Sequence, residues 1–98
     1  MLSPENIRAV QALDEAGSYD DAAAALHCSR KNVERRVQAA REYCRDKLLV
    51  HEDGTWRRTA LYDELKPHFD ALLAQMQQIE RVRNDWVKGP QPVLEPRS

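Results

Sequence analysis

Apolar residues in the first 44 positions recur three and four residues apart in three short stretches, the spacing of amphipathic helices. The first stretch follows Ser3-Pro4-Glu5, a typical helix start, and ends at Gly17. Ser18 and Ser29 are the candidate N-caps of the next two helices. The apolar positions of the three stretches are Ile7, Val10 and Leu13, then Ala22, Ala23 and Leu26, then Val33, Val37, Ala40 and Cys44. The pattern predicts three consecutive helices with almost no linker between them.

The helical spacing ends near residue 47, where two short runs of strand-favouring residues follow. These runs are 48–50 and 55–58, and His51-Glu52-Asp53-Gly54 lies between them. Asp-Gly between two such runs is a strong hairpin signal. We therefore expect a β-hairpin, with Trp56 as the side chain that anchors it to the core.

A long amphipathic helix is predicted from its N-cap Thr59 to about Val87, just before Gly89-Pro90. Pro67 should bend this helix. Apolar residues recur every seven positions in two series, Tyr62, Phe69 and Met76, and Leu65, Leu72, Ile79 and Trp86. Because these series extend further than one small domain needs, we expect them to form a homodimer interface of the coiled-coil type. Packing of the helix against its own domain is the alternative.

These elements predict a mainly α protein with a winged helix-turn-helix fold, in which three helices and a β-hairpin wing precede a long C-terminal dimerisation helix. Ninety-eight residues fit a single domain. We expect residues 1–59 to form the winged helix-turn-helix and residues 60–88 the dimerisation helix. The remaining residues, 89–98, contain three prolines and are expected to be a disordered tail.

The charges are unevenly distributed, although the formal net charge is only −1. Residues 1–28 carry a net −4, residues 29–58 a net +4 and the remainder −1. Nine of the fifteen basic residues therefore lie within these thirty residues, 29–58, which span the third helix and the hairpin. A local basic stripe, more than the total charge, is typical of a DNA-binding surface.

The third predicted helix has the composition of a recognition helix, the helix of a helix-turn-helix that enters the major groove of DNA. If its apolar row faces the core, the residues that point outward are Lys31, Arg35, Gln38 and Glu42, with Asn32 and Glu34 beside them. Arg and Lys suit guanine, Asn and Gln suit adenine, and Glu suits cytosine. This face can therefore read base edges.

Other basic residues are better placed for the DNA backbone. Arg30 and Arg36 lie off the centre of the outward face. Arg57 and Arg58 lie on the second strand of the wing, where they can contact either the backbone or an adjacent groove. The predicted DNA-binding residues are Ser29, Arg30, Lys31, Asn32, Glu34, Arg35, Arg36, Gln38, Arg57 and Arg58.

The run Ser18-Tyr19-x-x-Ala22-Ala23-x-x-Leu26, followed by Ser29 and Arg35, carries a resemblance to a known family. It resembles the N-terminal DNA-binding domain of LysR-type transcriptional regulators, on which residues 17–59 can be laid without a gap. Further matching positions are Gly17, Val33, Val37, Leu48 and Thr59. The resemblance covers about the first 70 residues, and it implies a DNA-binding regulator whose last helix pairs with that of a second copy. The winged helix of ModE-type regulators is a similar architecture.

The sequence departs from the LysR-type pattern at several positions. Arg30-Lys31 stands where the family has Gln-Pro, and Glu34 where it has Ser, so a relative's base preference does not transfer. The remaining departures are Ala40 for Leu, Arg45 for the Gly before the wing, and Leu49-Val50-His51 for Phe-x-Arg. Because only about ten residues follow the last helix, we expect no effector-binding domain and no control by a small ligand.

Signals of catalysis are missing from the sequence, so we expect no enzyme, no cofactor and no metal site. His27, His51 and His68 have no metal-ligand spacing. Cys28 and Cys44 align with apolar family positions and are expected to be buried thiols, with a redox switch as the less favoured alternative. No apolar run is long enough to span a membrane and no signal peptide is recognisable, so we expect a cytoplasmic protein.

Together these patterns predict a sequence-specific double-stranded DNA-binding transcriptional regulator that acts as a homodimer on a pseudo-palindromic site. Two other classes stay open. A protein-interaction module would bind another transcriptional regulator through the last helix, as an anti-activator or co-regulator. An architectural or partition protein would coat DNA without regulating a promoter.

Overall fold

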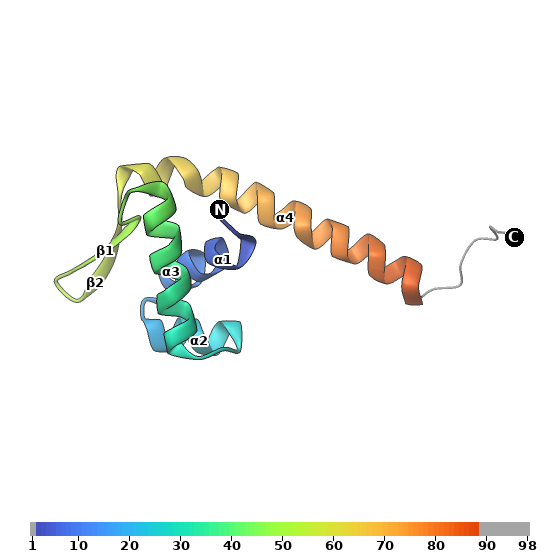
Figure 1. Cartoon of the computed structure of the whole chain (residues 1–98), viewed down its shortest axis with the longest axis horizontal. Coiled ribbons are helices and arrows are strands. Elements are labelled where there is room, and N and C mark those ends of the chain that lie inside the picture. Colours follow the sequence, from blue (N-terminus) through green and yellow to red (C-terminus); the bar gives the residue numbers. More distant parts are fainter. Residues whose placement is uncertain (1, 89–98) are drawn as a thin grey trace, which may run out of the picture.

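The computed structural model describes residues 2–88, which form four helices and one two-stranded hairpin (Figure 1). The helices are α1 (Pro4–Ala16), α2 (Tyr19–Leu26), α3 (Arg30–Cys44) and α4 (Ala60–Lys88). The strands are β1 (Leu49–Glu52) and β2 (Thr55–Arg58). This order confirms the predicted winged helix-turn-helix with a long last helix. The tail predicted to be disordered, residues 89–98, lies outside the described residues.

Serine side chains cap the first three helices, as the sequence predicts. The Oγ atoms of Ser3, Ser18 and Ser29 accept hydrogen bonds from the backbone N–H three residues later, at 3.2, 3.0 and 3.1 Å. Each bond satisfies a donor that has no partner inside its helix. Gly17 ends α1 at φ +82°, a left-handed conformation that glycine adopts at little cost. The caps explain why three helices fit into so few residues.

The hairpin has the two-residue turn that Asp53-Gly54 predicts. β1 and β2 are antiparallel, with Glu52 opposite Thr55 and Leu49 opposite Arg58. Both turn residues have positive φ, +50° and +79°, which matches the right-handed twist of the strands. The first strand begins one residue later and ends two residues later than the sequence pattern suggests, because the turn is this short.

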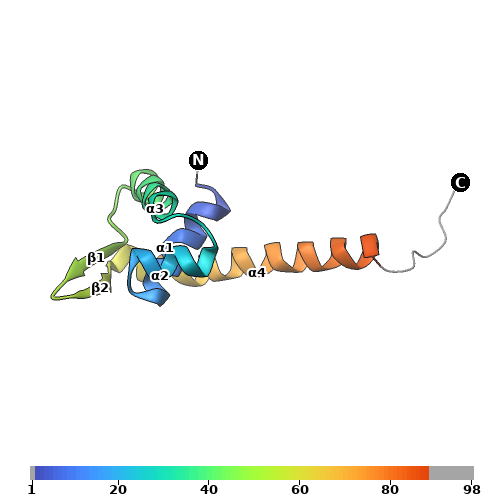
Figure 2. The ribbon, with the colours of Figure 1, turned by 90° about the horizontal axis from the view of Figure 1, so that it is seen from below.

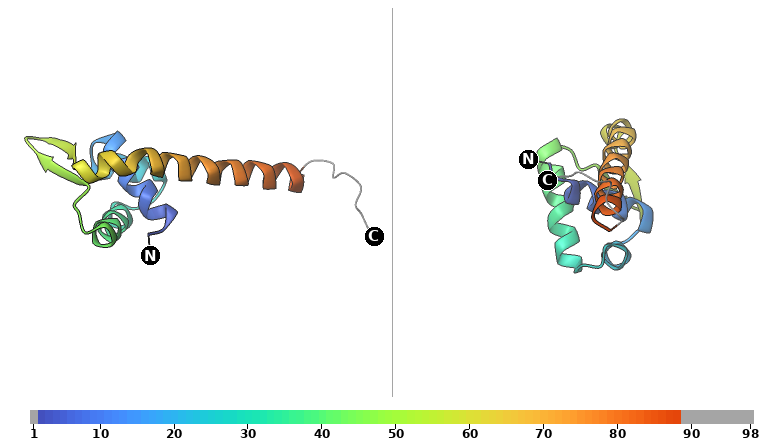
Figure 3. Two further views of the ribbon diagram at one scale, coloured as in Figure 1. Left: turned by 90° about the horizontal axis from the view of Figure 1, so that it is seen from above. Right: turned by 90° about the vertical axis from the view of Figure 1, so that its right-hand side faces the viewer.

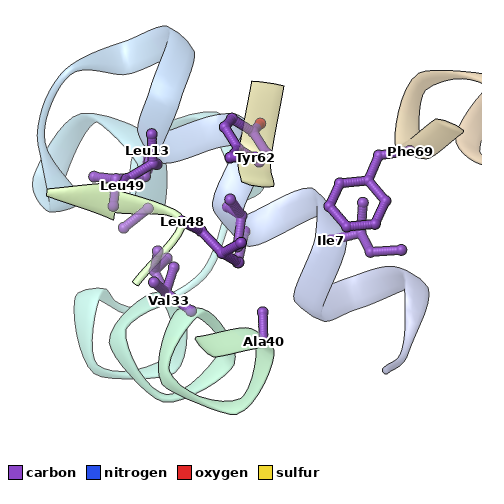
Figure 4. Close-up of a cluster of buried hydrophobic side chains, with 13 residues drawn as sticks. Ile7, Leu13, Val33, Ala40, Leu48, Leu49, Tyr62 and Phe69 are labelled. Atoms are coloured by element: carbon purple, nitrogen blue, oxygen red, sulfur yellow. The ribbon is translucent and has the colours of Figure 1, made fainter. Parts of the chain in front are cut away.

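One apolar core joins all parts of the winged domain (Figure 4). Ile7, Val10 and Leu13 of α1 face Val33, Val37 and Ala40 of α3, with Leu48 and Leu49 at the base of the wing. The first turns of α4 close this core with Tyr62 and Phe69. The expectation that these two residues face a second copy is thereby corrected: both are buried within one chain and have almost no surface left for a partner. We call them the core pair.

Tyr62 is the largest of the fully buried side chains, and its hydroxyl is a buried polar atom without a hydrogen-bond partner among the described residues. Burial raises the pKa of this hydroxyl, because the charged form would lose its solvation. Tyr62 thus contributes apolar contact to the core while its hydroxyl opposes folding.

The remainder of α4 extends away from the winged domain, on the side opposite to the wing (Figures 2 and 3). The helix continues through Pro67 to Lys88, and the molecule measures 62 × 26 × 20 Å. Leu72, Ile79 and Trp86, which belong to the second seven-residue series, are exposed. We call these three residues the distal row. Within the described residues, no helix is long and apolar enough to cross a membrane.

Candidate nucleic-acid interface

The outward face of α3 lies as the helical spacing predicts. Val33, Val37 and Ala40 are buried, whereas Lys31, Arg35 and Gln38 are exposed. Asn32 and Glu34 are half-buried at the edges of this face, and Ser29 is exposed at its N-terminal end. The face therefore presents donors and acceptors from the first three turns of the helix.

Polar side chains on this face are paired with one another. The Arg35 guanidinium donates through Nη2 to Asn32 Oδ1 at 2.8 Å, and Gln38 Nε2 donates to Glu42 Oε2 at 3.3 Å. Lys31 forms no ion pair or side-chain hydrogen bond within residues 2–88. The three outward residues thus differ in how freely their groups can turn to a ligand.

Arg30 is held by acidic residues, which the sequence did not indicate. Its guanidinium contacts Glu34 at 3.0 Å and Asp20 of α2 at 3.4 Å. It also lies over the ring of Tyr19, 5.5 Å from the centroid. The hydrogen bond to Glu34 and the charge of Asp20 raise the pKa of Arg30. Arg30 therefore links the start of α2 to the start of α3, and its charge is largely balanced. Arg36, the other arginine of α3 that is predicted to contact the DNA backbone, is half-buried.

The two arginines of the wing have different surroundings. Arg57 is exposed and lies 3.6 Å from Glu52 across the hairpin. Arg58 instead contacts Asp14 of α1 at 2.8 Å and lies over the ring of Tyr62. The hydrogen bond that the Arg58 guanidinium donates to the Asp14 carboxylate raises the pKa of Arg58. Arg58 therefore ties the base of the wing to α1, while Arg57 is the wing arginine that points to solvent.

Trp56 connects the wing to the helical domain, as expected. Its ring meets that of Tyr19 edge to face, with centroids 5.6 Å apart, and that of His51 at 4.9 Å. Trp56 is half-buried and packs against the core. Because Tyr19 also carries Arg30, the same contacts place the wing next to the first turn of α3.

The junction between α3 and the wing is held by a polar network that the sequence did not reveal. Leu48 is buried at φ +66°, a conformation that costs a non-glycine residue on the order of 1–3 kcal/mol. Its N–H donates to Asp46 Oδ1 at 2.7 Å, and its carbonyl accepts from the N–H of Thr59 at 2.9 Å. The Arg41 guanidinium donates to the carbonyls of Lys47 and Leu49, at 2.8 and 2.9 Å. These bonds fix the angle between the recognition helix and the hairpin.

An open groove of about 560 Å³ separates α3 from β1. Its lining includes Gln38 from the outward face, Arg45 and Lys47 from the junction, and His51 from the wing. Arg45 and Lys47 are exposed. Both lie within the basic segment 29–58, but neither is among the predicted DNA contacts. Glu42 and Asp46 also line the groove, so the basic residues that connect α3 to the wing alternate with acidic ones.

The remaining candidates for chemistry within residues 2–88 are a metal site and the two cysteines. No group of three or more His, Cys, Asp and Glu residues there could hold a metal ion. Cys28 and Cys44 are free thiols, both half-buried. Burial raises the pKa of the Cys44 thiol, which keeps it protonated at neutral pH.

Solved structures similar to this one share its fold at low sequence identity. BenM_DBD in its complex with catB site 1 DNA is 19% identical, with a TM-score of 0.77 over 90% of this chain and 99% of its own. The LysR family transcriptional regulator VV2_1132 is 19% identical, with a TM-score of 0.79 over 92% and 31%. The oxidized form of OxyR from Corynebacterium glutamicum is 14% identical, with a TM-score of 0.79 over 86% and 26%. The chain thus spans about a quarter to a third of the two longer proteins.

Comparison of the sequence with protein families gives a match over most of the winged domain. No curated protein sequence matches the chain significantly. The profile of the bacterial regulatory helix-turn-helix proteins of the lysR family matches residues 4–61, from the first residue of α1 to the second residue of α4. Because this match covers more than half of the chain, the protein belongs to the lysR family of bacterial regulatory helix-turn-helix proteins.

Proposed function

We propose that this protein is a transcriptional regulator that binds double-stranded DNA at specific sequences, as a homodimer on a pseudo-palindromic site. The observation that carries the proposal is the exposed face of α3, where Lys31, Arg35 and Gln38 stand next to a hairpin wing. Side chains of this kind on the first turns of a recognition helix can reach base edges in the major groove.

Family membership and fold support the DNA part of this proposal. BenM_DBD has been crystallised with catB site 1 DNA and with benA site 1 DNA, and this chain covers 99% of it in both cases. Basic residues gather on α3, the junction and the wing, although the whole chain is slightly acidic. Such a local basic surface attracts the phosphate backbone.

The distal row supports the homodimer. Ile79 is 65% exposed and Trp86 48% exposed, and both lie on a part of α4 that extends beyond the winged domain. A second copy of the same helix can cover this row in a symmetric dimer. Two winged domains related by such a symmetry would present two recognition helices to successive major grooves.

Selection of bound duplexes from random DNA tests the proposal. We expect the wild-type protein to enrich a sequence with two inverted half-sites whose centres lie about one helical turn, or a multiple of it, apart. On that sequence, Lys31→Ala or Arg35→Ala should weaken binding by about 1–3 kcal/mol. Arg81→Ala removes the same charge from an exposed arginine of distal α4 and serves as the matched control.

Two results would contradict the proposal. The first is a folded wild-type protein that enriches no sequence and protects no site in a footprint. The second is capture of another transcriptional regulator by residues 60–88 in the absence of any DNA binding, which would favour the interaction-module hypothesis. Uniform binding to DNA of any sequence would instead favour an architectural role.

A further inference from the structure

The contacts among the side chains of α3 decide which of them can read a base. Glu34 is oriented by Arg30, whose Nε contacts one of its two carboxylate oxygens at 3.0 Å. Arg30 is in turn held by Asp20 of α2 and by the ring of Tyr19. Both residues are therefore engaged in joining α2 to α3.

The two amides on the same face are also engaged. Reading adenine requires the oxygen and the nitrogen of one amide together, since the oxygen accepts from N6 and the nitrogen donates to N7. Asn32 Oδ1 already accepts from Arg35, and Gln38 Nε2 already donates to Glu42. Each amide is thus oriented by a neighbouring side chain, and the bond uses one of the two hydrogen-bonding positions of a reading atom.

Lys31 and Arg35 are the outward cations that remain for bases. Both are exposed, and neither has an acidic partner within the described residues. The bond to Asn32 orients the Arg35 guanidinium and leaves its other N–H groups to donate. Lys31 and Arg35 lie one helical turn apart on the same face, ~6 Å along the axis, which is close to two base steps of ~3.4 Å.

We propose that each half-site contains two guanines separated by one base pair, one read by Lys31 and the other by Arg35. Guanine offers two acceptors in the major groove, N7 and O6, which match the donors of these two side chains. Asn32 is then a positioning residue that holds the Arg35 guanidinium in place. This inference rests on the proposed function, because it names the bases that the α3 face selects.

A duplex with a modified base tests the inference directly. 7-Deazaguanine lacks the N7 acceptor but keeps its Watson–Crick pairing. On the enriched site, replacing either guanine should lower the affinity of the wild-type protein about tenfold or more. With Lys31→Ala, the effect of one replacement should disappear while the effect of the other persists. With Arg35→Ala the pattern should be reversed.

Arg30→Gln is the matched control, since it removes a neighbouring charge that the structure assigns to the α2–α3 contact. This variant should keep both replacement effects even if its overall affinity falls. Asn32→Ala should reduce only the effect at the guanine assigned to Arg35. The inference is overturned if the enriched site lacks guanines at this spacing, or if both replacement effects survive in Lys31→Ala. Failure to enrich any site would instead reject the proposed function itself.

Discussion

Two faces of α4 have opposite surroundings, although both follow the same seven-residue repeat. The core pair, Tyr62 and Phe69, packs against α1 and the base of the wing. The distal row, Leu72, Ile79 and Trp86, is exposed to solvent. The two series are offset by three residues, which turns them apart by about 60° around the helix. Position along the helix matters as well, because Leu65 of the second series packs against the core. The geometry therefore allows the core pair to serve the domain and the distal row to serve a partner.

The difference shows what a heptad pattern can and cannot predict. It correctly predicts a long helix with an apolar stripe, because apolar periodicity follows from helix geometry. It cannot tell which surface covers each series, because the covering residues lie far away in the sequence. Ile7 of α1, which lies in the same core as Phe69, belongs to a different helix. For this reason the pattern alone places Tyr62 and Phe69 at the dimer interface, although both belong to the core.

The largest expected effect comes from truncating the core pair. Phe69→Ala should lower the free energy of unfolding by about 3 kcal/mol, because it leaves a cavity between α4 and α1. Ile79→Ala, the matched change in the distal row, should leave the unfolding of the monomer nearly unchanged. Urea denaturation followed by circular dichroism at low protein concentration measures both. Equal losses in the two variants would mean that the two faces do not differ.

A second test places charge in the distal row. Leu72→Asp with Ile79→Asp should give monomers at micromolar concentration, because the two carboxylates cannot be buried in an interface without partners. At the same concentration we expect the wild-type protein to have twice the chain mass. Light scattering after size exclusion measures the mass. Ala74→Asp with Arg81→Asp changes charge on the opposite side of α4 and should remain dimeric. A monomeric wild-type protein would refute the homodimer and the paired half-sites.

Local sequence patterns predict the helix caps and the turn, whereas they do not predict contacts between residues far apart in the chain. Ser18 and Ser29 cap their helices and Asp53-Gly54 forms its turn, because each depends on residues within a few positions. The outward direction of Lys31 follows in the same way from helical spacing. The pairing of Arg58 with Asp14 joins residues 44 positions apart, and no local pattern specifies it.

The same limit applies inside the candidate interface. Arg30 has the charge of a phosphate contact, but Asp20 lies beside it only once α2 and α3 have packed together. Arg41 likewise has no sequence signal for its role, since its partners are backbone carbonyls of the junction. Charge and spacing could therefore indicate the surface, while the tertiary contacts decide which of its residues are available.

Arg58 extends the comparison from α4 to the wing, with a smaller effect. Arg58→Gln should lower the free energy of unfolding by about 1 kcal/mol, because it leaves the mostly buried Asp14 carboxylate without its charged partner. The effect is no larger because water partly screens the half-exposed guanidinium. Arg57→Gln, the neighbouring change in the same strand, should alter stability much less because its pair with Glu52 is exposed. A larger loss of stability with Arg57→Gln would contradict the assignment of Arg58 to the domain.

Tyr62→Phe should act in the opposite direction. The change keeps the ring in the core and removes a buried hydroxyl that has no partner among the described residues. We expect stability to rise by up to about 1 kcal/mol, because an unsatisfied buried polar group opposes folding. Thermal denaturation at fixed protein concentration measures the shift. A clear loss of stability would show that the hydroxyl has a favourable partner in solution.

The smallest expected effect depends on pH and concerns the attachment of α4 to α1. Asp70 Oδ1 accepts a hydrogen bond from Gln11 Nε2 at 2.6 Å, and Asp70 Oδ2 lies 2.9 Å from Lys66 Nζ. The bond from Lys66, with that from Gln11, lowers the pKa of Asp70 in the folded state. A carboxylate whose pKa is lowered in the folded state stabilises the protein fully at pH values above its unfolded pKa. This contribution is lost as the pH falls through the folded pKa.

Asp70→Asn should therefore reduce the free energy of unfolding slightly at pH 7. At a pH below the lowered folded pKa of Asp70, the variant and the wild type should have the same stability. Asp85→Asn is the matched control, because it removes an exposed carboxylate of distal α4 that has no ion pair among the described residues. A difference between wild type and Asp70→Asn that stays constant with pH would mean that Asp70 does not hold α4 through its charge.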